Sequence, residues 1–248
     1  MYSLIPIKNK DYPLRLSPDK LFYSEYKYKR PFFFHNSIKN NSEPLVPSME
    51  NFTFKISNIT NEYILDSMVF EHCDYYIDYI YDEEINSAML PLNPYYPTGI
   101  GGMGILKKWG PNQISYSIIV TYNINNNYYE LLVIDNSNKY SLISGDVEYN
   151  EIINNNIYKH LKYFLNIKNA KFISSGYLNS PKNTDHAWME YSTYLFNLNN
   201  SERIKLLKFI KNNSYTNFKL INIDKNSKEY KLIDINDLYF LNMVKNFF

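Results

Sequence analysis

Cysteine is nearly absent from the sequence. Its only cysteine, Cys73, excludes an intramolecular disulfide framework, and no spacing of cysteine and histidine suggests a zinc site. Long apolar runs are also missing. None approaches the ~20 residues that cross a bilayer, so we expect no membrane span. The formal net charge of +1 produces no global field, which argues against a dedicated nucleic-acid-binding protein.

Targeting signals are missing from the start of the chain. The first residues, MYSLIPIKNKDYPLRL, contain neither a secretory apolar region nor a transit segment rich in Arg and Ser. We therefore expect an intracellular protein, in the cytoplasm by default. The 248 residues can bury a full core, as one large domain or as two unequal ones.

Glycine is scarce but concentrated. Five of the seven glycines lie in the run PTGIGGMGILKKWGPN, residues 97–112. Glycine permits positive φ and a close approach of the backbone, so this cluster predicts a sharply bent, closely packed turn region. Two interpretations stay open. The glycine content alone favours a tight connection without a ligand, whereas Lys107 and Trp109 beside many amides would suit a nucleotide with phosphates.

The pattern along the chain predicts an α/β protein. Residues 1–92 are broken by prolines and predict a lobe of short strands and loops. Residues 93–248 predict strands, one central helix, further strands and a terminal helix, an order typical of a sandwich with a mixed sheet. Strands are expected at 32–34, 52–56, 116–122, 128–134, 140–143, 171–177, 186–198, 218–223 and 230–233, and helices at 151–165, 201–212 (capped by Ser201) and 236–247.

Two motifs in this chain resemble one protein family. The run W-G-P-N at 109–112, preceded by T-G at 98–99, is similar to motifs before the catalytic domain of ADP-ribose pyrophosphatases of the Nudix superfamily. That branch also supplies the cytosolic domain of ADP-ribose-gated cation channels. Pro97 stands where the family has Arg, and Gln113 where it has His. Downstream, GYLNSPKNTDHAWME at 176–190 resembles the family's G-Y-x-x-x-P-R-N-T-D-N-A-W-M-E.

The resemblance implies a fold and an activity. The fold would be a Nudix-type α/β/α sandwich with a mixed sheet at 93–248, preceded by a smaller N-terminal lobe at 1–92. The activity of the family is hydrolysis of ADP-ribose to AMP and ribose 5-phosphate with Mg²⁺. Three glutamates of the pattern G-x5-E-x7-R-E-U-x-E-E-x-G hold the metal, because they share one face of a helix.

That pattern, the Nudix box, is degenerate in this chain at 145–166. Gly145 and Glu151 match it, and Lys159 stands for its Arg. The three metal glutamates are replaced by other residue types: His160, Tyr163 and Phe164. A histidine nitrogen is a poor ligand for Mg²⁺ and the aromatic rings supply no carboxylate, so we expect impaired hydrolysis.

Glu151 is the only surviving glutamate of the box and therefore the catalytic candidate. A simpler interpretation is that its carboxylate sits in the first turn of a helix, where the helix dipole favours it. A displaced metal could in principle be held by Asp146, Glu148 and Glu151, although metal sites need ligand geometry as well as ligand count.

The resemblance also implies ligand contacts. Asp185 and Asn183 would face the ribose end and Lys182 a phosphate, whereas Trp188 and Met189 are expected in the core. His186, Tyr116 and Thr121 depart from the family's residues. The implied substrate-binding set is Gly99, Gly101, Gly102, Lys107, Trp109, Asn112, Lys182, Asn183 and Asp185.

Three functions fit these observations. The first is a pseudoenzyme that binds ADP-ribose or a related nucleotide diphosphate sugar without efficient hydrolysis. The second is an active ADP-ribose diphosphatase with an altered metal site, which would need Mg²⁺ as cofactor. The third is a structural or interaction protein that retains only the fold and has an unidentified protein partner. Fold alone does not choose among them.

Overall fold

The structure of the chain, a computed structural model, describes residues 32–34, 77–80, 88–91, 93, 95, 98–137, 139–148, 151–213 and 217–247. The strand predicted at 52–56 lies outside these residues. Two compact units are present: residues 1–112 with 177–190, and residues 113–176 with 191–248. The domain boundary that we predicted at residue 92 stays a prediction.

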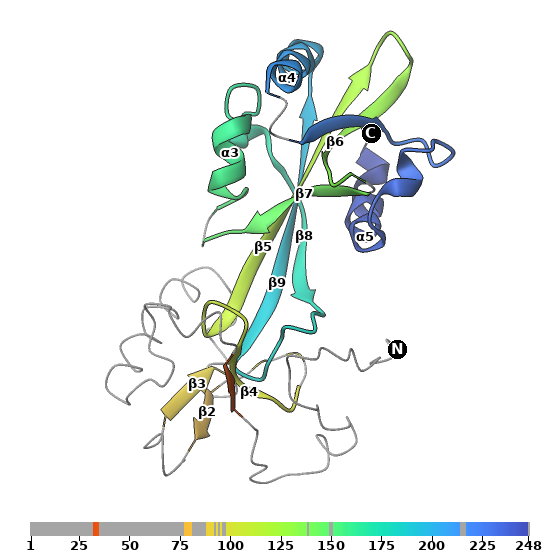
Figure 1. Ribbon diagram of the computed structural model, residues 1–248. Coiled ribbons are helices and arrows are strands. Elements are labelled where there is room, and N and C mark those ends of the chain that lie inside the picture. Colours follow the sequence, from red (N-terminus) through yellow and green to blue (C-terminus); the bar gives the residue numbers. More distant parts are fainter. Residues whose placement is uncertain are drawn as a thin grey trace. The chain divides into compact units, whose positions relative to one another are not determined.

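The first unit contains two small sheets. Strand β1 (Phe32–Phe34), which the sequence predicts, pairs in parallel with β4 (Gly101–Gly104), and β2 (Ile77–Ile80) pairs antiparallel with β3 (Ala88–Pro91) (Figure 1). The glycine run bends sharply, as predicted, because Gly99, Gly102, Gly104 and Gly110 have φ of 80°, 83°, 59° and 73°. Residues other than glycine rarely adopt these φ values.

A six-stranded mixed sheet of order β10-β6-β7-β5-β9-β8 lies mostly in the second unit. Strand β6 pairs antiparallel with β10, β7 and β5, and β7 pairs antiparallel with β5. The strands are β5 (Gly110–Asn123), β6 (Tyr128–Asp135), β7 (Tyr140–Asp146), β8 (Lys171–Leu178), β9 (Ala187–Leu198) and β10 (Phe218–Asn222).

Helices cover both faces of this sheet (Figure 1): α3 (Asn155–Leu161) and α4 (Asn200–Asn212) on one face, α5 (Ile235–Val244) on the other. Side chains alternate along a strand, so each strand serves two cores. Ile119 of β5 packs in the cluster that contains Leu161 of α3 and Leu206 of α4. On the opposite face, the rings of Tyr116 and Tyr191 lie 3.7 and 5.0 Å from that of Phe240 in α5. The predicted α/β class with a mixed sheet is confirmed.

The central helix is shorter than predicted. It begins at Asn155 rather than at 151, because the Asn154 side chain accepts hydrogen bonds from the backbone N–H groups of Asn156 and Ile157 at 3.0 and 3.4 Å. The helix ends at Leu161, and residues 162–164 form a turn. Glu151 therefore precedes the helix, and the prediction that it lies in the first helical turn is wrong.

Two other local predictions are wrong. The cap of α4 is Asn199 rather than Ser201, because Asn199 and Glu202 bond reciprocally in a capping box. The strand predicted at 230–233 is a 3-10 helix, Tyr230–Leu232, and only Ile233 bridges to the sheet, at Tyr140. Two further 3-10 helices are Ile167–Asn169 and Lys245–Phe247. No helix in the described ranges has the length and apolar character to cross a membrane, and the cytoplasmic location stays a prediction.

Candidate functional site

Asp185 holds the start of the glycine run. Its Oδ1 accepts hydrogen bonds from the backbone N–H and hydroxyl of Thr98, the latter at 2.8 Å, and from the N–H of Gly99 at 3.1 Å. The Asp185 backbone N–H donates to the carbonyl of Ile100 at 2.7 Å. Asp185 is fully buried, so these donors stabilise a carboxyl group that water does not reach.

The neighbours of Asp185 extend this network. The Thr184 hydroxyl donates to the carbonyl of Gly102 at 2.6 Å, and the Gly102 N–H donates to Nδ1 of His186 at 3.0 Å. Gly110 donates to the His186 carbonyl at 2.8 Å. The histidine that replaces the family's asparagine thus supplies an acceptor for a glycine N–H. Together, residues 98–104 and 183–186 form what we call the Asp185 network.

Asn183 closes the turn before Asp185. Its Nδ2 donates to the Tyr177 hydroxyl at 2.8 Å and to the Leu178 carbonyl at 2.9 Å, while its Oδ1 accepts from the Met189 N–H at 2.9 Å. The Asn183 side chain is fully buried. An asparagine with donors and acceptors engaged in this way fixes the conformation of the turn.

The Asn112 side chain fixes the conformation of the loop at 107–109 through hydrogen bonds to its backbone. Its Oδ1 accepts from the N–H groups of Lys107 and Lys108 at 3.2 and 3.1 Å, and its Nδ2 donates to the Lys108 carbonyl at 2.9 Å. Trp109 is buried within this loop, whereas the Lys107 side chain is exposed. The loop therefore presents a cation from a rigid backbone.

The structure sorts the predicted ligand contacts by exposure. Lys107 and Lys182 are exposed and Asn112 is half-buried. The others are buried, and their roles as ligand contacts stay predictions: Gly99, Gly101, Gly102, Trp109, Asn183 and Asp185. Trp188 and Met189 are buried, as predicted.

Glu190 is a polar residue that the sequence reasoning did not single out, although it ends the second motif. It is 8% exposed, and its Oε1 accepts from Nε1 of Trp188 at 2.9 Å and from the Tyr95 hydroxyl at 3.4 Å. The tryptophan two residues earlier was the available signal, because a buried indole N–H needs an acceptor.

The segment that resembles a degenerate Nudix box, residues 145–166, begins with a glycine that serves packing. A Cβ at Gly145 would lie 3.0 Å from Cβ of Asn154, the residue that caps α3. Asn154 cannot move away easily, because its Nδ2 also donates to the Asp146 carbonyl at 2.5 Å. The match of Gly145 to the family pattern thus has a structural reason that requires no metal.

The three positions of the metal glutamates do not form a ligand set. His160 is exposed in the last turn of α3, and Tyr163 is 73% exposed in the turn that follows. Phe164 is 4% exposed and its ring lies 5.6 Å from that of Phe209 in the core. Because α3 ends at Leu161, the three residues do not share one helical face.

The acidic residues before α3 are the other candidates for a metal. The Glu148 N–H donates to Oε2 of Glu151 at 3.0 Å, and Asn155 donates to Oε1 of Glu151. Within the described ranges, no three His, Cys, Asp or Glu side chains gather in a way that could hold a metal ion. The residues of the box therefore do not fit Mg²⁺, which takes oxygen ligands in octahedral geometry.

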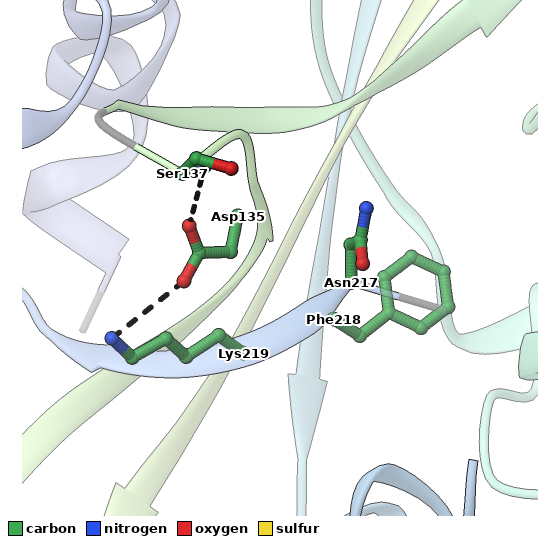
Figure 2. Close-up of a pocket in the computed structure, with 5 residues that line it drawn as sticks. All are labelled: Asp135, Ser137, Asn217, Phe218 and Lys219. Carbon is green, nitrogen blue, oxygen red and sulfur yellow. Dashed lines mark hydrogen bonds and ion pairs between the residues drawn. The ribbon is translucent and has the colours of Figure 1, made fainter. Parts of the chain in front are cut away.

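A hollow of about 360 Å³ lies elsewhere in the second unit, and Figure 2 shows the residues that line it. Lys219 points toward Asp135, 3.9 Å from its Oδ2, and donates to the Tyr140 hydroxyl at 2.6 Å. That hydrogen bond is the main cause of a raised pKa of Lys219. None of the predicted site residues lines the hollow, whose walls are Asp135, Ser137, Asn217, Phe218 and Lys219.

Comparison with known proteins gives curated relatives and solved structures. No family model matches the chain. The chain is 30% identical over 130 residues to the Caenorhabditis elegans protein "Putative nudix hydrolase 6", a match that covers 46% of this chain and 48% of the relative. The chain thus spans about half the length of that relative. This similarity supports the resemblance to the Nudix superfamily that the motifs indicate.

The solved structures are more distant. A mutT/nudix family protein from Listeria innocua is 14% identical with a TM-score of 0.38, over 54% of this chain and 92% of that chain. The C. elegans Ap4A hydrolase is 13% identical with a TM-score of 0.32, over 55% and 97%. Superpositions of this quality carry no argument about the site. The similarity to a curated Nudix relative, which covers 48% of that relative, and two motifs in the family's order together support the resemblance to the Nudix superfamily.

Proposed function

We propose that this protein is a Nudix-type protein that binds ADP-ribose or a related nucleotide diphosphate sugar and hydrolyses it poorly or not at all. One observation carries the proposal: the positions of the metal glutamates hold His160, Tyr163 and Phe164, and Phe164 is part of the core. Without carboxylates there, the diphosphate loses the metal that would neutralise its charge and activate water.

The rigidity of the two motif segments, 98–112 and 176–190, supports ligand binding. Their side chains hold the loops in one conformation, so little ordering is needed when a ligand arrives. Lys107 and Lys182 are exposed cations on these loops, and an ammonium group suits a diphosphate. We assign the phosphates to these two lysines and the ribose to the turn at Asn183 and Asp185. The N–H groups of Gly99, Gly102 and Gly110 are already bonded within the protein, so these glycines shape the loop rather than bind phosphate.

An active ADP-ribose diphosphatase is the second candidate. It is favoured by the adjacency of Glu148 and Glu151, whose backbone and carboxylate are joined at 3.0 Å. Two carboxylates and solvent oxygens would have to hold the metal, with Asp146 as a further ligand. This candidate requires turnover that stops on chelation and falls in Glu151→Gln.

The test is incubation of the purified protein with ADP-ribose, with Mg²⁺ or with EDTA, followed by filtration. AMP released and intact nucleotide retained on the protein are scored separately, and calorimetry gives the affinity. We expect retained, uncleaved ADP-ribose that is insensitive to EDTA. Lys107→Gln and Lys182→Gln should weaken retention, whereas Lys225→Gln, an exposed lysine of the second unit, should not.

Other outcomes reject the proposal. AMP that scales with protein and vanishes with EDTA would favour the active diphosphatase. No heat at millimolar ligand and no AMP would remove both candidates and favour an interaction protein with a fixed partner, which co-purification would identify.

A further inference from the structure

The outer surface formed by α3, the turn and 3-10 helix that follow it, and α4 is strongly basic. Between Ile152 and Thr184 the sequence contains no Asp or Glu, and between Arg203 and Ile223 there is again none. The first part of each stretch, residues 155–169 and 203–212, lies in the layer that covers one face of the sheet, where Phe164 after α3 meets Phe209 of α4. The exposed lysines of this layer are Lys159, Lys162, Lys168, Lys205, Lys208 and Lys211. We call them, with the apolar residues below, the α3–α4 surface.

These charges are not neutralised from within the described part of the chain. None of the six lysines forms an ion pair with a described carboxylate. The only acidic residue of α4, Glu202, is bonded to the Asn199 N–H at 2.8 Å in the capping box. Arg203 points inward to buried Glu130, with Nε 2.8 Å from Oε2. The six lysines therefore give this layer a local excess of positive charge, although the net charge of the protein is only +1.

Apolar side chains stand among these lysines. Ile204 and Leu207 of α4 are 44% and 38% exposed, and Tyr163 in the turn after α3 is 73% exposed. Ile204 and Leu207 are three residues apart, so they are neighbours on one face of the helix, next to Lys208 and Lys211. Single exposed apolar residues are ordinary, but here they share a surface with the uncompensated lysines.

We infer that the α3–α4 surface docks on an anionic lipid membrane. Lysines near such a surface are attracted by its negative potential, and their flexible stems let the ammonium groups reach the headgroups while apolar neighbours enter the interface. Ile204, Leu207 and Tyr163 supply the apolar contact, and no groove is required because the partner is a plane. This binding would be peripheral and reversible.

The residue types favour lipid over other polyanions. A nucleic-acid surface would gain nothing from exposed aliphatic side chains, and its usual reader of phosphates and bases, arginine, is engaged internally here at Arg203. An acidic protein partner would leave the aliphatic pair without a defined pocket. The surface lies within the second unit, so this inference does not depend on ADP-ribose binding.

The test is flotation of the full chain with vesicles of phosphatidylcholine alone and of phosphatidylcholine with phosphatidylserine in equal amounts. We expect binding to the anionic vesicles only, weakened by added salt. The triple variant Lys205→Glu, Lys208→Glu, Lys211→Glu should bind on the order of a hundredfold more weakly. Ile204→Ser with Leu207→Ser should bind several-fold more weakly, although the charge is unchanged.

A matched control is present in the chain. Lys225, Lys228 and Lys231 are also exposed and have the same spacing, but Asp224, Glu229 and Asp234 lie near them in the sequence. Changing those three lysines to Glu alters the net charge equally, and we expect an effect of less than about threefold. Circular dichroism and urea midpoints should show that all variants fold.

Three results would overturn the inference. One is the absence of binding to anionic vesicles at low salt, and another is equal loss of binding in the two lysine triples. The third is binding to single-stranded RNA that outcompetes vesicles and is indifferent to the Ile204 and Leu207 changes, which would identify a nucleic-acid surface instead.

Discussion

Asp185 is the residue on which the first unit depends most visibly. Its buried carboxyl accepts hydrogen bonds from two backbone N–H groups and one hydroxyl, at Thr98 and Gly99. Replacing it with alanine leaves those donors unpaired in a site that water does not fill. We expect Asp185→Ala to lower the free energy of unfolding by about 2–4 kcal/mol in urea denaturation.

The control for this change is Asp224→Ala. Asp224 is exposed, and its carboxylate accepts a hydrogen bond from the Asn226 N–H at 2.8 Å. Its loss should cost less than about 1 kcal/mol. Equal effects of the two substitutions would show that the Asp185 network is not what holds the glycine run.

Asp237 is a buried carboxyl of the second unit whose protonation should affect stability. Burial raises its pKa above the usual 3.8, the Leu142 N–H, 2.7 Å from Oδ2, lowers it, and the charge of Asp234 raises it. The folded chain therefore holds this proton more tightly than the unfolded chain does. As pH rises from 3.8 through the folded pKa, ionisation of Asp237 costs folding free energy.

We therefore expect Asp237→Asn to be more stable than the natural chain at neutral pH. The asparagine still offers an oxygen to Leu142, but it never ionises. Burial also raises the pKa of the adjacent Tyr116 to about 12, so Tyr116 stays neutral throughout this range. The urea midpoints of the natural chain and of Asp237→Asn, measured from pH 7 downward, should converge as the pH approaches 3.8. A difference that widens toward low pH would contradict this account.

At the residue scale, the sequence identified which side chains matter better than what they do. The second motif singled out Asn183 and Asp185 through a family resemblance. Their hydrogen bonds to Tyr177, Thr98 and Gly99 were not predictable, because a motif does not state which distant backbone groups it will meet.

The residue that caps the N-terminus of α4 can be identified by substitution. Asn199 accepts from the Glu202 N–H at 3.0 Å, and the Glu202 carboxylate accepts from the Asn199 N–H. We expect Asn199→Ala to destabilise the second unit by about 1 kcal/mol. Ser201→Ala, at the position favoured by the sequence pattern, should cost less than about 0.5 kcal/mol. Reversed magnitudes in urea denaturation would identify Ser201 as the cap.

Gly145, in the connection from β7 to α3, lies close to the Asn154 side chain, and a substitution tests whether this close packing matters. An added Cβ would press on Asn154, which two hydrogen-bonding roles hold in place. We expect Gly145→Ala to destabilise by about 1–3 kcal/mol. The matched change Gly176→Ala meets only the Tyr191 ring, at 3.4 Å, and should cost distinctly less. Thermal unfolding of both variants compares them directly.

At the element scale, the sequence pattern located β5 to β10 but not the ends of the helices, and it wrongly predicted a strand at 230–233. The strands at β5 to β10 follow alternating runs that the sequence displays. The helix at 151–165 was overextended, because apolar spacing continues through Ile153 and Leu165 although the backbone is not helical there. Both residues are buried in the core, so tertiary packing rather than helical periodicity explains that spacing.

The whole protein should respond to ligand and not to metal. Under the proposed function, ADP-ribose binds only the folded chain. At a concentration of a hundred times Kd it should therefore add about 2.7 kcal/mol to the free energy of unfolding, and the unfolding temperature should rise. We expect the same shift in Mg²⁺ and in EDTA, and none from Mg²⁺ alone, measured by differential scanning fluorimetry. Ribose 5-phosphate, which lacks the diphosphate, is the control. A shift that appears only with Mg²⁺ would restore a metal site.

The sequence by itself determined the properties that depend on residue type and spacing. These are the α/β order, the bend at the glycine cluster and the absence of carboxylates at 160, 163 and 164. The tertiary structure alone decided which residues meet. Asp185 reaches Thr98 across 87 positions, and two basic stretches distant in sequence share the layer that contains α3 and α4. Such contacts arise from how apolar faces pack together, and no local pattern records which distant segments that packing brings together.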